Sequence, residues 1–221
     1  MLWPKFWGST GPNFQALQPW IEGLAVQLGT PNEETLRFIG IAACSPGEGA
    51  TTIACAVANR IQTGLAKRVL LIDANLRSPR LHQLFGLPVT PGLIDLLNGR
   101  CTLREAVQTV DDSGLCVITA GTSVSGSLAI FESEAFHAMK SRLREYFDTV
   151  IFDCSPLDGE ADTFVVAKRL DGLVIVLAAE KTRWANGSRL VDRLRSANIN
   201  VLGAALNGRR FFIPQQIYQR L

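Results

Sequence analysis

Six short apolar runs alternate with longer helical patterns from residue 36 onward, and this alternation constrains the fold more than any other feature of the sequence. The predicted strands are Leu36–Ala43, Arg68–Asp73, Leu115–Thr119, Thr149–Asp153, Gly172–Ala178 and Asn200–Asn207. The predicted helices between them are Thr51–Thr63, Ala129–Tyr146, Ala161–Arg169 and Trp184–Ala197. The strands are continuously apolar, so we expect helices to cover both faces of the sheet. The pattern predicts an α/β fold with a doubly wound, mostly parallel sheet.

Composition excludes several other classes of protein. The chain has 221 residues, of which 47% are hydrophobic and 19% charged, a balance that suits one domain with a full core and not a disordered or collagen-like chain. The formal charge of +2 is too small to indicate a nucleic-acid partner. No apolar run has the roughly 18 residues of a spanning helix, and we expect no signal peptide. The five cysteines lack CxxC pairing and are typical of a reduced, cytoplasmic protein.

The two ends of the chain differ from its middle. We divide it into an N-terminal segment, 1–35, with one predicted helix at Phe14–Gly29, a central domain, 36–208, and a C-terminal tail, 209–221. The first segment holds three of the four tryptophans, Trp3, Trp7 and Trp20, and the tail begins Arg209-Arg210-Phe211-Phe212. Both segments could pack on the domain or form a docking surface for a partner.

A glycine-containing turn follows the first predicted strand and opens the first predicted helix. It comprises Gly47, Glu48, Gly49, Thr51 and Thr52, with Ala50 between. Two glycines in such a turn let backbone N–H groups surround a phosphate, and the helix N-terminus adds its positive dipole end. Thr51 stands where a P-loop hydroxyl would bind Mg²⁺. This turn is the candidate cofactor-binding loop.

Two aspartates end neighbouring predicted strands. Asp73 closes the run Val69–Asp73, and Asp153 closes the run Thr149–Asp153. Each alone could be a helix N-cap. Ligands of open α/β sheets bind beyond the carboxyl ends of the strands, so the two acids are candidate catalytic residues. With Thr51 they form the candidate Mg²⁺ ligand set.

Taken in order, these motifs resemble the bacterial tyrosine kinases of polysaccharide synthesis (BY-kinases), whose cytoplasmic P-loop module is related to the MinD/ParA ATPases. The resemblance spans roughly residues 14–208 and rests on SPGEG-TT, LIDANLRSPRLHQLFGL, PGLIDLLNG, FDTVIFDCSP, DGLVIVLAAEKTR and VLGAALN. It implies a P-loop NTPase fold that binds ATP or ADP with Mg²⁺ between these loops. It also implies that Asn207 lies near the adenine.

Two departures from the family pattern fall on charged positions. Ala50 stands where the P-loop of the family has lysine, and Asn75 where it has a second aspartate. A charge-assisted hydrogen bond from that lysine to phosphate is worth about 1.5–3 kcal/mol, and losing such a donor can lower a rate on the order of 10²–10³-fold. Asn75 can neither act as a base nor carry charge. These residues argue against phosphoryl transfer, and ATP or ADP with Mg²⁺ is not a firm expectation for this chain.

Two further departures concern the family's assembly and phosphorylation. The tail has one tyrosine, Tyr218, where the family has a cluster, and the second tyrosine, Tyr146, is expected to pack in a helix. The N-terminal helix lacks the Glu and two Arg at three-residue spacing that family members use to form a ring. Ring assembly by that device is therefore not expected, and a homo-oligomer of another kind stays an open alternative.

The resemblance implies a degenerate, kinase-like cytoplasmic subunit of bacterial exopolysaccharide or capsule synthesis and export, held at the inner membrane by a polysaccharide co-polymerase (chain-length regulator). One alternative is an active tyrosine autokinase or weak ATPase that uses Thr51, Asp73 and Asp153 and modifies Tyr218. Lys181 or Arg183 could then replace the missing lysine, although solvated surface charges are the simpler interpretation. The other alternative is a ParA/MinD-like positioning ATPase, against which Ser45 counts because it replaces a second lysine of that class.

Overall fold

A seven-stranded sheet forms the centre of the protein, in the strand order β3-β4-β2-β5-β1-β6-β7. Six strands are parallel and β3 is antiparallel to β4. The structure is a computed structural model that describes residues 14–29, 36–110, 114–122, 127–158 and 161–208. The docking candidates of both ends, Trp3, Trp7, the Trp20 side chain and the tail with Tyr218, lie outside the described residues. The predicted α/β fold with a doubly wound, mostly parallel sheet is confirmed.

The six predicted strands lie within one or two residues of their predicted bounds, and β3 is additional. The strands are β1 Phe38–Ala43, β2 Val69–Ala74, β3 Gln108–Thr109, β4 Cys116–Ile118, β5 Thr149–Cys154, β6 Gly172–Ala178 and β7 Val201–Asn207. The helices are α1 Phe14–Gly29, α2 Ala50–Leu65, α3 Leu81–Phe85, α4 Leu93–Leu97, α5 Leu103–Ala106, α6 Glu134–Tyr146, α7 Ala161–Ala167 and α8 Trp184–Ser196. A 3₁₀ turn, η2 Ser127–Glu132, precedes α6.

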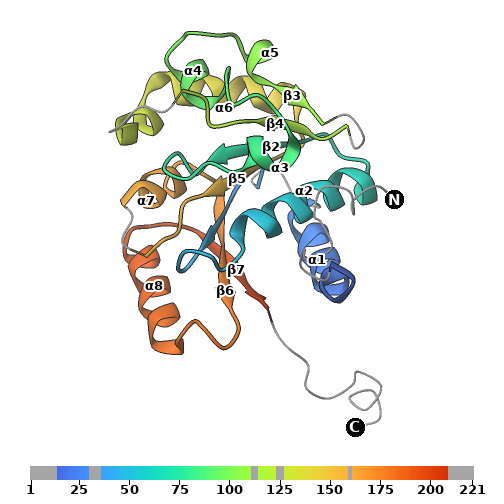
Figure 1. Cartoon of the computed structure of the whole chain (residues 1–221). Helices are drawn as coiled ribbons and strands as arrows, with labels where there is room; N and C mark the ends of the chain where they lie inside the picture. Colours follow the sequence, from blue (N-terminus) through green and yellow to red (C-terminus); the bar gives the residue numbers. More distant parts are fainter. Residues whose placement is uncertain (1–13, 30–35, 111–113, 123–126, 159–160, 209–221) are drawn as a thin grey trace.

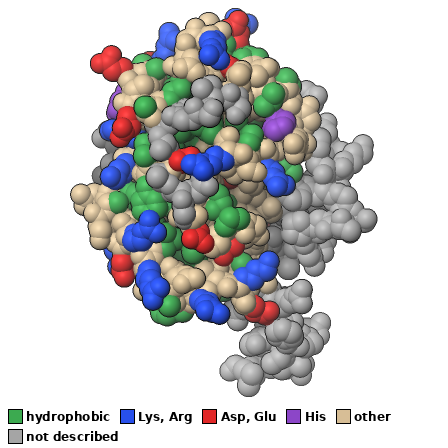
Figure 2. All heavy atoms as spheres, turned by 60° about the vertical axis from the view of Figure 1, so that its left-hand side comes forward, with side chains coloured by type: hydrophobic (Ala, Val, Ile, Leu, Met, Phe, Trp, Pro, Cys, Tyr) green, Lys and Arg blue, Asp and Glu red, His purple; other side chains and the backbone are tan. Residues whose placement is uncertain are grey.

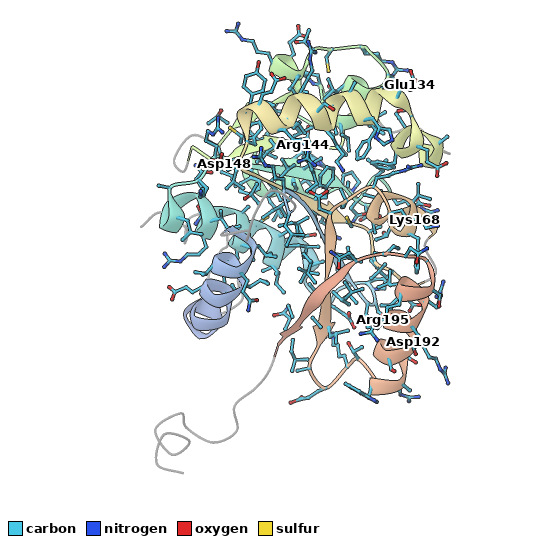
Figure 3. All side chains as sticks on the ribbon, turned by 180° about the vertical axis from the view of Figure 1, so that it is seen from behind. Glu134, Arg144, Asp148, Lys168, Asp192 and Arg195 are labelled. Atoms are coloured by element: carbon cyan, nitrogen blue, oxygen red, sulfur yellow. The ribbon has the colours of Figure 1, made fainter. Side chains whose placement is uncertain are left out.

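Helices cover both faces of the sheet, as the doubly apolar strands require (Figure 1). One core joins α1, α2 and α3 to the side chains on one face. The other core joins the opposite face to α4 through α8. Seen from behind, α6 with Glu134 and Arg144 and α8 with Asp192 and Arg195 lie along this second face (Figure 3). The loops at the carboxyl ends of the parallel strands are therefore flanked by helices from both layers.

The N-terminal helix packs on the domain. Ile21, Ala25 and Leu28 of α1 are buried in the same core as α2. This spacing of four and three residues places them on one face of the helix. Glu22 forms an exposed ion pair with Arg60 of α2 at 3.0 Å, a contact of the kind that contributes at most about 1 kcal/mol. Burial of the three apolar side chains is thus the main attachment of α1.

Some elements differ from the sequence prediction. The helix predicted at Ala129–Tyr146 is split, because η2 ends at Glu132 and Ser133 caps α6 by accepting a hydrogen bond from the N–H of Phe136 at 3.2 Å. Tyr146, expected to be packed, is 57% exposed. The short helices α3, α4 and α5 and the strand β3 were not predicted. Across the described residues, we find no helix with both the length and the apolar character needed to cross a membrane.

Candidate functional site

The turn between β1 and α2 places the predicted phosphate-binding residues in one loop at the carboxyl edge of the sheet (Figure 1). Gly47 and Gly49 have φ angles of 81° and 96°, a left-handed backbone that glycine adopts at little cost. A Cβ atom at Gly49 would also lie 2.3 Å from the side-chain nitrogen of Asn207. Thr51 and Thr52 occupy the first turn of α2 and are partly exposed. The left-handed backbone at position 49 and the nearness of the Asn207 side chain both favour glycine there.

Glu48 fixes this loop to two distant parts of the chain. Its buried carboxylate accepts hydrogen bonds from the N–H of Ser45 at 3.0 Å and from the hydroxyl of Thr182. Its backbone carbonyl accepts a hydrogen bond from the side-chain nitrogen of Asn207 at 2.8 Å. The Thr182 hydroxyl also accepts from the N–H of Ala178 at 3.0 Å. Glu48 and Asn207, predicted as cofactor-binding residues, therefore hold the shape of the loop.

Asp73 sits at the end of β2 with its carboxylate turned into the following loop. One oxygen accepts hydrogen bonds from the N–H groups of Arg80 and Leu81 at 2.9 and 3.0 Å. The other oxygen accepts from the N–H of Asn75 at 3.2 Å. Burial raises the pKa of Asp73 to about 6, although these backbone donors oppose the rise. Asp73 thus organises the segment that links β2 to α3.

Asp153 lies beside Asp73, in register with it across β2 and β5. It is fully buried, and neither carboxylate oxygen has a hydrogen-bond partner. Burial raises its pKa well above the usual range, the Asp73 carboxylate raises it further, and the Thr51 side chain acts in the opposite direction. An unpartnered buried carboxylate is costly to a fold. Asp153 therefore presents acceptor oxygens that the described part of the chain leaves unused.

Asn75 joins the ends of the same two strands. Its side-chain oxygen accepts hydrogen bonds from the Ser155 hydroxyl at 2.9 Å and from the N–H of Ser78 at 3.3 Å. The carbonyl of Ser155 in turn accepts from the Thr163 hydroxyl at 2.7 Å. The amide oxygen of Asn75 thus serves as a structural acceptor between the two strand ends.

Positive charge is scarce at the loop. Ala50 is buried at the start of α2, with 8% of its surface exposed, and offers neither a donor nor a charge. Lys181 and Arg183, considered as substitutes for the lysine, have exposed side chains. Within the described residues, neither forms an ion pair or a hydrogen bond with the loop. Sequence analysis singled out these two cations and missed Thr182 between them, which reaches Glu48 from 134 residues away.

The residues present fit a divalent cation better than they fit a triphosphate. The unused oxygens of Asp153 and the nearby Thr51 hydroxyl are hard oxygen donors of the type that Mg²⁺ prefers. The Asp73 carboxylate lies next to these donors and already accepts hydrogen bonds from three backbone N–H groups. When bound, Mg²⁺ would neutralise the two carboxylates and polarise a phosphate oxygen. At the start of α2, beside the glycine turn, Ala50 supplies no charge.

Comparison with known proteins defines the class first. A solved structure of the VpsO kinase domain superposes with a TM-score of 0.78 at 28% identity, covering 90% of this chain and all of that one. The MinD cell division protein of Aquifex aeolicus superposes with a TM-score of 0.64 at 20% identity, covering 83% of this chain and 72% of that one, a likeness of fold alone. No protein-family model matches the chain. The fold is that of the MinD/ParA-like P-loop NTPases.

Sequence relatives define the family within that class. Tyrosine-protein kinase YwqD of Bacillus subtilis is 30% identical over 178 residues, which cover 80% of this chain and 75% of YwqD. Tyrosine-protein kinase ptk of Acinetobacter johnsonii is 32% identical over 141 residues, 64% of this chain but 19% of that protein. The chain belongs to the bacterial tyrosine kinase family, as the sequence resemblance indicated.

Proposed function

We propose that this chain is a degenerate member of its family, a kinase-like cytoplasmic subunit of exopolysaccharide or capsule synthesis and export that does not transfer phosphate. The observation that supports this most directly is Ala50, buried at the start of α2 where a cation would meet the phosphates. Glu48, Asp73 and Asp153 give the same region three carboxylates. Without a cation from the protein, a triphosphate would meet mainly negative charge there.

The proposed role is one of contact. In the family resemblance, the partner is a membrane polysaccharide co-polymerase that holds this domain at the inner face of the membrane. The Trp-rich N-terminal segment and the Arg209–Phe212 segment are the proposed contact regions, because aromatic and arginine side chains are enriched at binding hot spots. A co-polymerase tail immobilised on a surface should capture the full chain. Loss of capture on replacing Arg209–Phe212 with Ser and Gly residues would identify the tail as the contact.

The test of inactivity is a comparison of four proteins for ATP hydrolysis and autophosphorylation with Mg²⁺. The proteins are the unmodified chain, Ala50→Lys, Ala50→Lys with Asn75→Asp, and Ala50→Met with Asn75→Asp. Methionine restores side-chain length without charge, so it controls for packing at the start of α2. We expect turnover in the lysine-containing double variant at least about 100-fold above that of the unmodified chain, and none in the methionine control.

Magnesium-dependent turnover by the unmodified chain would overturn the proposal. A Lys181→Ala variant then shows whether another cation serves the phosphates, since a loss of ATP affinity would identify that side chain as the substitute. No turnover in any variant would mean that pocket features besides positions 50 and 75 have diverged, with the unmodified chain inactive as proposed.

A second candidate function is weak binding of Mg²⁺ and nucleotide without efficient turnover. The unpartnered carboxylate of Asp153 next to Thr51 favours it, because a divalent cation would satisfy oxygens that are otherwise buried at a cost. Calorimetric titration with ADP and ATP, with and without Mg²⁺, tests this function. If it holds, Mg²⁺ raises the melting temperature of the unmodified chain and leaves that of Asp153→Asn unchanged.

A further inference from the structure

A small cavity of about 230 Å³ lies beside the start of the phosphate-binding loop, between Ser45 and α8. Because α8 packs on the face of the sheet opposite α2, this cavity flanks the loop on the side away from α2. Figure 2 brings the side of α7 and α8 forward, where Lys and Arg side chains, with Asp and Glu among them, lie over the lower part of the surface. The polar residues that line the cavity are Ser45, Asp158, Asn186, Arg189 and Arg193.

Three of these residues share one face of α8. Asn186, Arg189 and Arg193 follow each other at spacings of three and four, so their side chains lie above one another along the helix. Leu190, within the same stretch, is 5% exposed and packs in the core. That anchor sets the rotation of the helix and holds both arginines at the wall of the cavity.

Among the described residues, no carboxylate pairs with either of the two arginines, Arg189 and Arg193. The Asp158 carboxylate accepts a hydrogen bond from the Ser45 hydroxyl at 3.2 Å. It forms no ion pair with an arginine of the described ranges. Two arginines against one aspartate leave an excess of one positive charge in a concave site, where an anion would be attracted.

The guanidinium of Arg193 makes a cation–π contact with an aromatic ring. It lies 5.1 Å from the ring centroid of Phe164, which belongs to α7. A cation–π contact uses one side of a guanidinium and leaves the N–H donors that point away from the ring available for a ligand. A donor group fixed in this way loses little conformational freedom on binding. Arg193 is therefore oriented by an aromatic ring and not by a competing carboxylate.

We propose that this cavity binds a phosphate group, as inorganic phosphate or as a phosphomonoester, through Arg189 and Arg193 with Asn186 as an additional donor. Guanidinium groups match the several acceptor oxygens of phosphate better than they match a single carboxylate. The volume exceeds the roughly 30 Å³ of one water molecule and is below the roughly 300–1,000 Å³ of sites for drug-sized ligands. The site is separate from the phosphate-binding loop and does not depend on whether that loop supports turnover.

The test is a titration of the full chain, labelled with ¹⁵N, with inorganic phosphate, phenyl phosphate and acetate. We expect the amide signals of Ser45 and of residues 186–193 to shift with both phosphates, and those of Gly47 and Gly49 to remain in place. The variant Arg189→Ala with Arg193→Ala should bind both phosphates at least about 10-fold more weakly. Arg195→Ala is the matched control, because this exposed arginine lines a different groove of α8 and should bind as the unmodified chain does.

The ligands separate the two sources of phosphate. Tighter binding of phenyl phosphate than of inorganic phosphate supports a phosphorylated side chain as the ligand, and exclusion of phenyl phosphate supports the free ion. Unchanged affinity in the double alanine variant, shifts confined to the glycine loop, or acetate binding as tight as phosphate binding would each overturn the proposal. The melting temperatures of the variants distinguish a loss of binding from a loss of fold. We expect them to be unchanged, because both arginines are exposed.

Discussion

Asp73 and Asp153 end adjacent strands in register, yet their surroundings are opposite. The segment after β2 turns back so that three of its N–H groups donate to Asp73. No N–H group of the segment after β5 donates to Asp153, whose carboxylate has no hydrogen-bond partner within the described residues. The comparison separates a carboxylate that builds the fold from one that the fold tolerates. The second kind marks the place where a ligand could supply what the chain does not.

Among the tests of this comparison, we expect the largest effect from the pH dependence of the free energy of unfolding. The rise in the pKa of Asp73 from 3.8 to about 6 corresponds to about 3 kcal/mol. A carboxyl group whose pKa is higher in the folded state stabilises the fold below its unfolded pKa, and that contribution is lost as the pH rises through the folded value. We expect the free energy of unfolding, measured by urea denaturation in EDTA, to fall from about pH 4 to pH 7. The raised pKa of Asp153 extends the decline to higher pH.

A control for the sign comes from Asp148. Its ion pair with Arg68 at 2.8 Å holds its pKa at about 2, so it acts in the opposite direction and only below about pH 4. The Asp73→Asn variant should remove most of the slope between pH 4 and pH 7. A stability that is flat or rising over this range in the unmodified chain would contradict the assignment of Asp73.

Removal of the Asp73 acceptor should be the most damaging of the single substitutions. Asp73→Ala leaves the N–H groups of Asn75, Arg80 and Leu81 without their acceptor. It also leaves a small void, and relief of the buried charge offsets part of the loss. We expect the free energy of unfolding at pH 7 to fall by about 2–3 kcal/mol. Asp192→Ala, on the exposed side of α8, is the control and should change it by less than about 0.5 kcal/mol.

The opposite sign is expected at the neighbouring carboxylate. Asp153→Asn keeps the volume and removes a buried group whose ionisation is opposed by burial and by Asp73. We expect a gain of about 1 kcal/mol at pH 8, measured by the same denaturation in EDTA. A loss of stability would show that Asp153 has partners in solution and would end the distinction between the two aspartates.

The smallest effect is expected at Asn75. Both of its donors, the Ser155 hydroxyl and the N–H of Ser78, can donate equally to a carboxylate oxygen. Asn75→Asp should therefore change the free energy of unfolding by no more than about 0.5 kcal/mol. Ser155→Ala, which removes one donor, should cost about 1 kcal/mol. A large loss from Asn75→Asp would show that the site has adapted to the amide and not merely lost a carboxylate.

The regular elements of this fold were readable because their signals are local. The run Gly172–Ala178 matches β6 and the helix Phe14–Gly29 matches α1 at both ends. The elements that escaped prediction, α3, α4, α5 and β3, have two to five residues, too few for a period to be recognised. The break before α6 depends on the Ser133 cap, and a serine between two glutamates inside an amphipathic helical pattern does not by itself reveal a boundary.

Only those parts of the candidate site that lie at the ends of predicted strands could be predicted from the sequence. The adjacency of Asp73 and Asp153 follows from two apolar runs that end in aspartate on neighbouring parallel strands. The tie between Glu48 and Thr182 has no sequence signal, because a hydrogen bond across 134 residues depends on how β6 and its following turn lie in space. The hydrogen bond from Ser155 to Asn75 joins residues 80 positions apart, and the sequence could not predict it for the same reason.

The two ties of Glu48 also set an order of events during biosynthesis. The glycine loop is made early, but its shape depends on Thr182 and on Asn207, the final residue of β7, 159 positions after the glutamate that it holds. A ribosome adds residues at about 5–20 per second. The turn between β1 and α2 therefore reaches its final shape roughly ten seconds or more after it is translated, when the last strand has joined the sheet.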